Sequence, residues 1–390
     1  MAEPVSAASP VIGAGQPADA ARLDRARDAM RARGVAALLI GVGADLRYLT
    51  GYTAHALERL TLLVLPADGR AALVVPRLES MAAAGCPAAQ AGRVEIEPWE
   101  ETDEPYALVA RELAPEPGRL LVDAALPARH VLALQSALPQ RDFALATEVT
   151  RDLRIVKGDE EVALLRRAAH AADRVVAQIA AGRLLGRTEA DVSREVRERL
   201  VAEGHEAASF AIVGSGPNGA SPHHEAGERV IEAGDPIVLD IGGTLQGYGS
   251  DITRMLWVTG GSAAHAPTDE FRRVFEAVHA AHAAATAAVR PGIQAAALDA
   301  TARTVLHDAG LGDAFIHRLG HGIGLEAHED PYLVASNREP IQAGNAFSVE
   351  PGAYLAGRFG VRIEDIVVCG PNGPDVLNQA PRDLLVVDGR

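Results

Sequence analysis

Two stretches of the sequence place a carboxylate inside each of two apolar strands that a Gly-containing turn joins. The first stretch contains Asp240 and Asp251, and the second contains Glu350 and Glu364. A lone carboxylate among apolar neighbours carries a large desolvation penalty, so such positions are rare unless the charge is compensated. We therefore expect the chain to fold around a cation that the four carboxylates share.

The segments that precede the two stretches also repeat each other. In each case, apolar residues with helical spacing predict a long helix followed by a shorter one, then strands. Asp240 precedes Glu350 by 110 residues, and the two long helices are separated by the same distance. We interpret this as an internal duplication of a helix-helix-hairpin unit. The predicted helices span residues 159–181, 188–203, 268–290 and 294–309.

The spacing within each stretch predicts a strand register. A turn at Leu245-Gln246 would place Asp240 opposite Asp251, and a turn around Gly357 would place Glu350 opposite Glu364. Directly opposed side chains share one face of a hairpin, with Cβ atoms about 4.5–5.5 Å apart. Two carboxylates so close repel each other unless one is protonated or a cation lies between them. Because the pattern occurs twice, a metal ion is the better explanation.

Histidines flank both stretches and could complete a metal site. His321 lies in Gly320-His321-Gly322 between the last predicted helix and the second hairpin, with His317 four residues earlier. His224 precedes the first hairpin. We take His321 as the first candidate ligand and keep the other two as alternatives, since a single histidine often has only a structural role. Oxygen-rich ligation favours Mn²⁺ or Mg²⁺, and an added imidazole admits Co²⁺, Fe²⁺ or Zn²⁺.

Composition and the remaining motifs narrow the class of protein. The net charge of −15 argues against nucleic acid and anionic membranes as partners, and no apolar run is long enough for a membrane helix. Two distant cysteines, Cys86 and Cys369, form no CxxC motif and fit a reducing cytoplasm. The sequence has no P-loop, no HExxH and no GxSxG motif. These observations favour a cytoplasmic protein with a metal site.

The 390 residues suffice for two domains. Residues 1–18 are small and polar and predict a disordered tail. Residues 19–152 predict a smaller α/β domain, including a hairpin at Asp68-Gly69, and residues 153–390 contain the duplicated units. No chemical motif is recognisable in the N-terminal domain.

Taken together, these motifs resemble those of the "pita-bread" metallopeptidases of family M24, which include prolidases, aminopeptidases P and methionine aminopeptidases. The resemblance covers about residues 153–369 and implies an α+β fold. The N-terminal segment Leu46–Tyr52 further resembles the creatinase/prolidase-type domain, which methionine aminopeptidases lack. The motifs that carry the resemblance are Leu239-Asp240-Ile241-Gly242, Ser250-Asp251-Ile252-Thr253-Arg254, Gly320-His321-Gly322-Ile323-Gly324, His328-Glu329, Val349-Glu350-Pro351-Gly352 and Arg362-Ile363-Glu364-Asp365.

The resemblance implies a site with two divalent metal ions, with Mn²⁺ expected before Co²⁺, Zn²⁺ or Fe²⁺, that activate a water or hydroxide. It further implies that Asp251 and Glu364 bridge the metals, that His223 lies on the substrate side, that His328 contacts the scissile peptide and that Arg362 orders the site. Alignment onto His224 in place of His223 stays open. The implied metal ligands are Asp240, Asp251, His321, Glu350 and Glu364.

The resemblance also implies an activity and an assembly. We expect hydrolysis of the Xaa-Pro bond of dipeptides or short proline-containing peptides by a homodimer. The prolidase-like run Ser221-Pro222-His223 and the compact chain favour a dipeptidase. An aminopeptidase P, a non-peptidase hydrolase on the same fold and a catalytically silent peptide-binding module are the alternatives.

Overall fold

The computed structural model describes residues 20–113 and 118–390. The tail predicted for residues 1–18 lies outside these residues. The chain divides into two compact units, the first ending at Arg154 and the second beginning at Ile155. The sheets and the hydrophobic cores of the two units are separate.

The N-terminal unit is built on a mixed six-stranded sheet with the strand order β4-β3-β2-β1-β5-β6. The central strand β1 is a continuous apolar run, VAALLI, whose residues are almost all buried, as in strands covered on both faces. The hairpin predicted at Asp68-Gly69 is confirmed, because β2 and β3 pair in antiparallel fashion on either side of it. The strands are β1 (Val35–Ile40), β2 (Leu62–Pro66), β3 (Ala72–Pro76), β4 (Glu95–Trp99), β5 (Arg119–Val122) and β6 (Asp142–Leu145).

Helices complete this unit. Helix α2 occupies most of the segment Leu46–Tyr52, for which the sequence indicates no secondary structure. The helices are α1 (Ala20–Ala32), α2 (Ala44–Thr50), η1 (Arg77–Glu79), α3 (Ser80–Ala84), α4 (Pro87–Gln90), α5 (Pro105–Glu112), α6 (Ala128–Ala137) and α7 (Thr147–Arg154).

The C-terminal unit consists of two halves that each begin with two helices, as the duplication predicts. Thr188 Oγ1 accepts a hydrogen bond from the N–H of Asp191 at 3.1 Å, which confirms the predicted start of the second helix. Thr268 Oγ1 accepts the N–H of Phe271 in the same way at the start of the third. The helices are α8 (Asp159–Ala180), α9 (Glu189–Ala202), α10 (Asp269–Ala288) and α11 (Ala295–Asp308), with the 3-10 turns η2 (Gly216–Ala220), η3 (Ala263–His265) and η4 (Gly312–Ala314).

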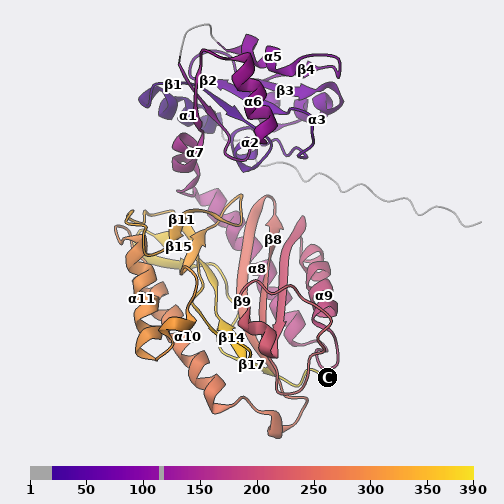
Figure 1. The fold of residues 1–390 in the computed structure, drawn as a ribbon, viewed down its shortest axis with the longest axis vertical. Helices are drawn as coiled ribbons and strands as arrows, with labels where there is room; N and C mark the ends of the chain where they lie inside the picture. Colours follow the sequence, from indigo (N-terminus) through magenta and orange to yellow (C-terminus); the bar gives the residue numbers. More distant parts are fainter. Residues whose placement is uncertain (1–19, 114–117) are drawn as a thin grey trace, which may run out of the picture. The chain divides into compact units, whose positions relative to one another are not determined.

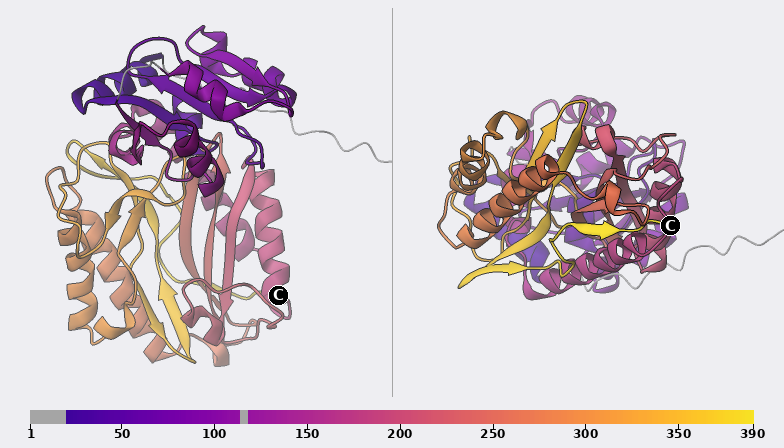
Figure 2. Two further views of the ribbon diagram at one scale, coloured as in Figure 1. Left: turned by 45° about the horizontal axis from the view of Figure 1, so that its top comes forward. Right: turned by 90° about the horizontal axis from the view of Figure 1, so that it is seen from below.

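The strands of this unit fill the space between its helix pairs, with α8 and α9 on one side and α10 and α11 on the other (Figures 1 and 2). One sheet has the order β17-β9-β8-β7, a second has the order β11-β10-β12-β15-β16, and β13 pairs with β14. The strands are β7 (Ala207–Ser215), β8 (Pro236–Leu245), β9 (Tyr248–Val258), β10 (Gly320–Gly322), β11 (Glu329–Leu333), β12 (Ala346–Val349), β13 (Gly352–Leu355), β14 (Phe359–Arg362), β15 (Asp365–Gly370), β16 (Gly373–Val376) and β17 (Leu385–Val387).

The register predicted for the first hairpin is wrong, because its turn lies one residue later in the sequence than predicted. Asp240 pairs with Thr253, and Asp251 pairs with Gly242. The turn lies at Gln246-Gly247, where both residues have positive φ (50° and 86°), as a two-residue type I′ turn requires. The sequence does not indicate the position of this turn, because a glutamine rarely adopts a positive φ. The correction shifts the pairing by two residues, so both aspartates still project from one face of the hairpin, now diagonally.

The register predicted for the second hairpin is correct. Leu355 pairs with Phe359 around Gly357, and Val349 pairs with Asp365 further along. Both pairs of strands keep one register, which places Glu350 opposite Glu364. The ladder is interrupted at these two residues, however, and divides into β12–β15 and β13–β14.

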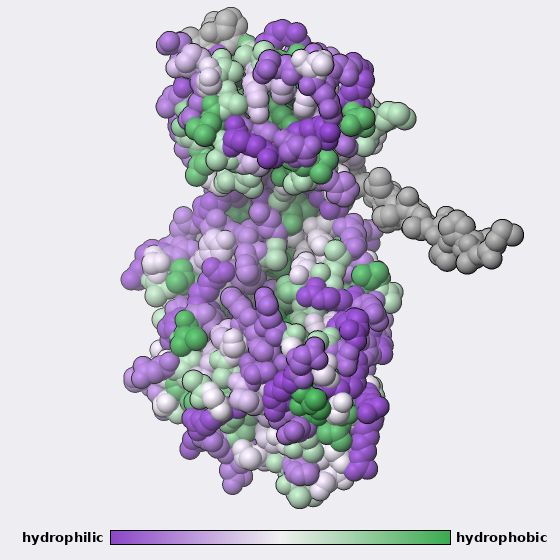
Figure 3. Space-filling model, turned by 45° about the vertical axis from the view of Figure 1, so that its right-hand side comes forward, coloured by the Kyte–Doolittle hydropathy of each residue, from purple (hydrophilic) through white to green (hydrophobic). Residues whose placement is uncertain are grey.

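Each half has its own apolar core. One cluster packs α8 and α9 against the first sheet, and the other packs α10 and α11 against strands of the second half. On the face drawn in Figure 3, hydrophilic side chains predominate and apolar ones are scattered. Within the described ranges, no helix has both the length and the apolar character needed to cross a bilayer.

Candidate metal centre

A cavity of about 660 Å³ lies within the C-terminal unit. It brings together the five metal ligands and the three catalytic residues that the family resemblance implies, although these residues are up to 141 positions apart in the chain. It also contains residues that the analysis did not assign to the site. The lining residues are Phe210, Ile212, Pro222, His223, Asp240, Asp251, His317, Arg318, His321, His328, Glu350, Arg362 and Glu364.

The four carboxylates reach the cavity from the two hairpins. Asp240 lies on β8 and Asp251 on β9, whereas Glu350 directly follows β12 and Glu364 directly precedes β15. Asp240, Asp251 and Glu364 are at most 7% exposed. The Glu350 side chain is 15% exposed. The two-residue alternation of strands explains why the aspartates share a face.

His321 projects from β10, the short strand between β11 and β12. A Cβ at Gly320 would lie 1.9 Å from Ser348 O, and one at Gly322 would lie 2.2 Å from Asp330 O. Only glycine therefore lets the strand fit so closely between its neighbours. The backbone N–H of His321 donates to Ser348 Oγ at 3.0 Å. The Gly-His-Gly sequence thus fixes the position of the imidazole.

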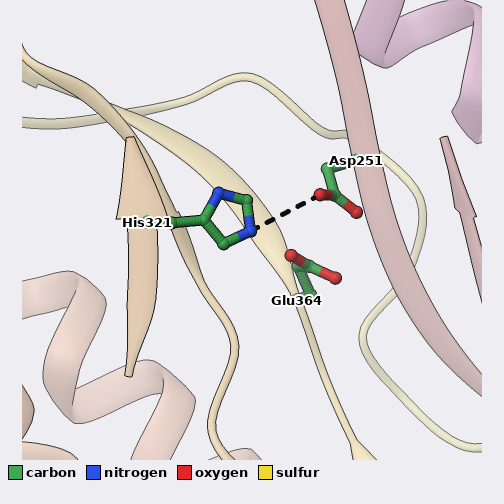
Figure 4. A group of neighbouring side chains, drawn as sticks. All are labelled: Asp251, His321 and Glu364. Atoms are coloured by element: carbon green, nitrogen blue, oxygen red, sulfur yellow. Dashed lines mark ion pairs between the residues drawn. The ribbon is translucent and has the colours of Figure 1, made fainter. Parts of the chain in front are cut away.

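The hydrogen bonds of His321 also fix its tautomer. Its Nδ1 lies 3.1 Å from Gly322 O, and because a carbonyl only accepts, the proton is on Nδ1. The Nε2 lone pair then faces Asp251 Oδ2 at 3.7 Å and Glu350 Oε1 at 3.4 Å. Figure 4 shows His321, Asp251 and Glu364 pointing toward one another. A lone pair directed at carboxylates suits a cation bound between the imidazole and the carboxylates, as at a metal site.

The electrostatics of the cluster lead to the same conclusion. Burial, together with repulsion from the neighbouring carboxylates, raises the pKa of Asp251 and of Glu364 well above their usual values. Burial raises the pKa of Glu350 to about 7, although Arg362 opposes the rise. Burial and the nearby His328 lower the pKa of His321 to about 3. Without a cation, the acidic groups are therefore driven to bind protons and the imidazole to lose one.

The donor set passes a further test for metal binding. Asp240 Oδ1 and Glu364 Oε1 are buried and have no hydrogen-bond partner among the described residues. Buried polar atoms without partners are uncommon, and they point to a bound ion or water at this position. One donor atom each from Asp251, His321 and Glu364 lies within 4.8 Å of the others. Carboxylates with one imidazole fit hard or borderline divalent cations.

Arg362 is the buried counter-charge of this cluster. Its guanidinium pairs with Asp240 Oδ2, donates to Thr253 Oγ1 at 3.1 Å and donates to Tyr354 OH at 2.7 Å. Thr253 Oγ1 in turn donates to Glu364 Oε2 at 2.7 Å. Burial lowers the pKa of Arg362, but the surrounding acidic groups outweigh it and raise the pKa overall. The arginine therefore links a carboxylate of one half to a carboxylate of the other.

The histidines divide into two groups. His223 and His328 line the cavity, and the ring of His328 lies 4.0 Å from that of His321 in an edge-on arrangement. His224 is not among the lining residues, and its Nε2 contacts Glu189 Oε2 at 2.7 Å. His317 also lines the cavity and contacts Tyr354 OH at 2.9 Å. The geometry thus favours His223 over His224 on the substrate side.

The sequence analysis missed three kinds of site residue. Phe210 and Ile212 on β7 give the cavity an apolar wall, and Arg318 gives it a second cation. Tyr354 joins Arg362 to His317. Arg318 could have been found from its place inside the His317–His321 motif. The apolar wall had no such signal, because apolar residues in a strand normally indicate core.

A duplicated α+β unit whose inner cavity gathers four carboxylates and a tautomer-fixed imidazole defines a metal-dependent hydrolase. Residues 163–371 match metallopeptidase family M24, and residues 22–156 match the creatinase/prolidase N-terminal domain. The chain belongs to metallopeptidase family M24 and is a metallopeptidase of the pita-bread fold.

Known proteins resemble this chain over nearly its whole length. A probable dipeptidase PepE of Mycobacterium tuberculosis is 45% identical over 369 residues, which cover 94% of this chain and 96% of the relative. An Xaa-Pro dipeptidase of Pyrococcus horikoshii is 31% identical, over 90% of this chain and 94% of the relative. The crystal structure of dipeptidase PepE from Mycobacterium ulcerans superposes with a TM-score of 0.88 at 48% identity, over 95% of this chain and 99% of that one.

Proposed function

We propose that this chain is an Xaa-Pro dipeptidase that holds two divalent metal ions between the halves of its C-terminal unit. The observation that carries the proposal is the single cavity lined by all of the expected ligands, which are Asp240, Asp251, His321, Glu350 and Glu364. The names of the relatives, dipeptidase PepE and Xaa-Pro dipeptidase, support the substrate class. When bound, the metal ions would lower the pKa of a water molecule and polarise the scissile carbonyl.

The chain's own residues perform the remaining tasks in this proposal. His328, beside His321, donates a hydrogen bond to the carbonyl oxygen as it gains negative charge. His223 contacts the substrate from the segment after η2. Arg362 holds Asp240 in place and links it through Thr253 to Glu364. Manganese is the metal that we propose, with Co²⁺, Zn²⁺ and Fe²⁺ as alternatives, because the donor set is rich in oxygen but includes one imidazole.

The choice of dipeptidase over aminopeptidase rests on Arg318. Its guanidinium lies over the ring of Tyr332, with Cζ 4.6 Å from the ring centroid. It lines the cavity that contains the proposed metal ligands. A dipeptide places a free carboxylate one residue beyond the scissile bond, whereas a longer peptide has an amide there. A guanidinium already in the cavity suits the free carboxylate.

This assignment can be tested with two substrates that differ only in the carboxylate, Ala-Pro and Ala-Pro amide. We expect Ala-Pro to be cleaved faster, and chelation to abolish cleavage until Mn²⁺ is added back. Arg318→Gln should raise the KM for Ala-Pro by about 10- to 100-fold, the worth of a charged hydrogen bond, and change the KM for the amide little. Activity that chelation does not change would refute the metal-dependent reaction.

Longer peptides discriminate the alternatives. Preferential cleavage of Ala-Pro-Ala-Ala, with no effect of Arg318→Gln, would reassign the chain as an aminopeptidase P. A metal-loaded protein that cleaves none of these peptides would indicate a non-peptidase hydrolase on the same fold.

We also infer that the chain forms a homodimer in a reducing cytoplasm. The described cysteines, Cys86 and Cys369, are both buried and unpaired, which supports the second part. Light scattering after size-exclusion chromatography should give twice the chain mass of 40.8 kDa. A mass of one chain would contradict the dimer.

A further inference from the structure

Glu189 is a buried carboxylate outside the metal centre. It is the first residue of α9 and is 0% exposed. Burial alone would raise its pKa, but hydrogen bonds from Ser215, His224 and Asn218 outweigh burial and leave the pKa below its usual value. Glu189 is therefore an ionised group inside the protein, fully surrounded by donors.

The donors to Glu189 are Ser215, the last residue of β7, and three residues in the segment 216–227 that follows it. Its Oε1 accepts the backbone N–H and the hydroxyl of Ser215, both at 2.7 Å. Its two oxygens each lie 3.1 Å from Asn218 Nδ2, and its Oε2 lies 2.7 Å from His224 Nε2 and 3.4 Å from Gly227 N. We call residues 216–227 the histidine segment. One carboxylate holds this segment at its beginning, middle and end.

The histidine segment is also tied to the metal centre. Pro222 O accepts a hydrogen bond from Arg362 Nη1 at 3.3 Å, and Arg362 pairs with Asp240. Between these two attachments lies His223, which lines the metal cavity. Pro222 fixes its own φ, and the next residue but one, His224, is held by Glu189. The backbone on both sides of His223 is thereby restrained.

We propose that Glu189 is a positioning residue that holds His223 at the metal cavity by ordering the histidine segment. This inference rests on the proposed function, because His223 contacts substrate only in that reaction. Glu189 is not among the residues that line the cavity, so it acts through the segment and not on the substrate. Small displacements of a substrate-contacting group reduce rates strongly even when the chemistry is intact.

A double-mutant cycle tests the proposal on the metal-loaded, full-length protein. Glu189→Gln keeps the shape but replaces one acceptor oxygen by a donor, which faces the donors of Ser215, His224 or Asn218. We expect kcat/KM for Ala-Pro to fall by about 10- to 100-fold, as when the partner of a catalytic group is removed. His223→Ala should cause a similar loss. The variant that carries both changes should be no worse than His223→Ala alone.

A matched control separates positioning from stability. Asp173 on α8 is also a buried carboxylate that accepts a backbone N–H, from Gln379 at 2.7 Å, and an amide, from Asn378 at 3.2 Å. Asp173→Asn should lower the melting temperature comparably yet leave kcat/KM within a factor of about two. The proposal would be overturned if Glu189→Gln left kcat/KM unchanged. It would also be overturned if the losses of kcat/KM caused by Glu189→Gln and by His223→Ala multiplied in the double variant.

A second measurement does not depend on the activity. Hydrogen exchange followed by mass spectrometry should show faster exchange across residues 216–227 in Glu189→Gln, with β8 and β9 unchanged and two metal ions retained. Unchanged exchange in this segment would refute the ordering role even if the protein proves inactive on Ala-Pro. Faster exchange in a protein that cleaves no Xaa-Pro bond would instead refute the proposed function and leave the ordering role intact.

Discussion

The two carboxylate hairpins of the C-terminal unit differ in one respect that their sequences barely show. In the first half, β8 and β9 form an unbroken antiparallel ladder from Pro236–Trp257 to the turn. In the second half, the ladder stops at Glu350 and Glu364 and resumes beyond them. The aspartates thus project from regular strands, whereas the glutamates lie where the strands are broken.

The break gives the backbone groups of the glutamates other partners. Glu350 N–H donates to Leu319 O at 2.9 Å, and Glu364 N–H donates to Thr253 O at 3.2 Å. Thr253 belongs to the first hairpin, so the second hairpin is joined to the first at the metal centre. Because buried N–H groups need acceptors, an interrupted ladder can connect two sheets where a continuous one cannot.

Side-chain length fits this difference. An aspartate on a regular strand places its carboxylate close to the sheet, and the two aspartates remain on one face even though they pair diagonally. A glutamate reaches one methylene further, which suits residues whose backbone has turned toward a neighbouring sheet. The duplicated halves therefore supply equivalent charges from unequal backbones.

The strongest test of this comparison removes one carboxylate charge from each half in turn. Asp251→Asn and Glu364→Gln each keep the side-chain shape and remove one carboxylate charge from the centre. We expect each variant to lose at least one of the two metal ions and to lose activity by more than the ~10- to 100-fold typical of residues that only support a ligand. Elemental analysis and Ala-Pro hydrolysis measure both effects. Two metals retained in either variant would refute a bridging role for that residue.

A second test uses a position at which the halves differ. His205 and Leu311 both follow a Gly after the second helix of their half and donate backbone N–H groups to equivalent carbonyls, Leu200 O and Leu306 O. Burial lowers the pKa of His205. Below pH ~6.5 an unfolded His205 binds a proton that the folded one does not, so folding stability falls as the pH decreases.

His205→Leu introduces the residue type that the second half has at the equivalent position, Leu311. We therefore expect the free energy of unfolding of this variant to depend less on pH than that of the wild type, between pH ~6.5 and the folded pKa of His205. The difference in slope should approach ~1.4 kcal/mol per pH unit, the value for one proton. Urea unfolding at several pH values measures it. His307, whose side chain is 82% exposed, provides the control as His307→Leu. Identical slopes in the wild type and His205→Leu would contradict the assignment.

The smallest expected effect concerns the two turns. Gly247 has φ of +86° in the two-residue turn of the first hairpin, and Gly357 has φ of +73° in the longer turn of the second. A Cβ at Gly357 would meet nothing within 4 Å, so Gly357→Ala should cost only backbone strain, about 1 kcal/mol. Gly247→Ala should cost at least as much, since the tight turn also sets the register of the ladder. Thermal unfolding compares the stability of the two variants. A larger loss of stability in Gly357→Ala than in Gly247→Ala would contradict this expectation.

Much of this architecture follows from local sequence patterns. The four long helices of the C-terminal unit can be predicted because each begins at a capping residue or after a Gly/Pro break and has apolar residues at helical spacing. Helix α9, which Thr188 caps, is an example. The strand register of the second hairpin can be predicted because Gly357 marks the centre of its turn. The register of the first hairpin cannot, because Gln246 adopts a positive φ that its residue type does not indicate. Helix α2 is short and begins at a Gly, which leaves little periodicity to detect.

The sequence by itself predicted that the four carboxylates share a cation, with His321 as the first candidate for a further ligand, because charged groups among apolar residues need compensation. Their motifs also identified the family. Only the tertiary structure decided which histidine faces the cavity: His223 lines it, whereas its neighbour His224 contacts Glu189, 35 residues earlier in the chain. It also placed Arg318 and the apolar wall of Phe210 in the same cavity. The apolar wall joins the cavity from a segment distant in the sequence, and no local pattern indicates it.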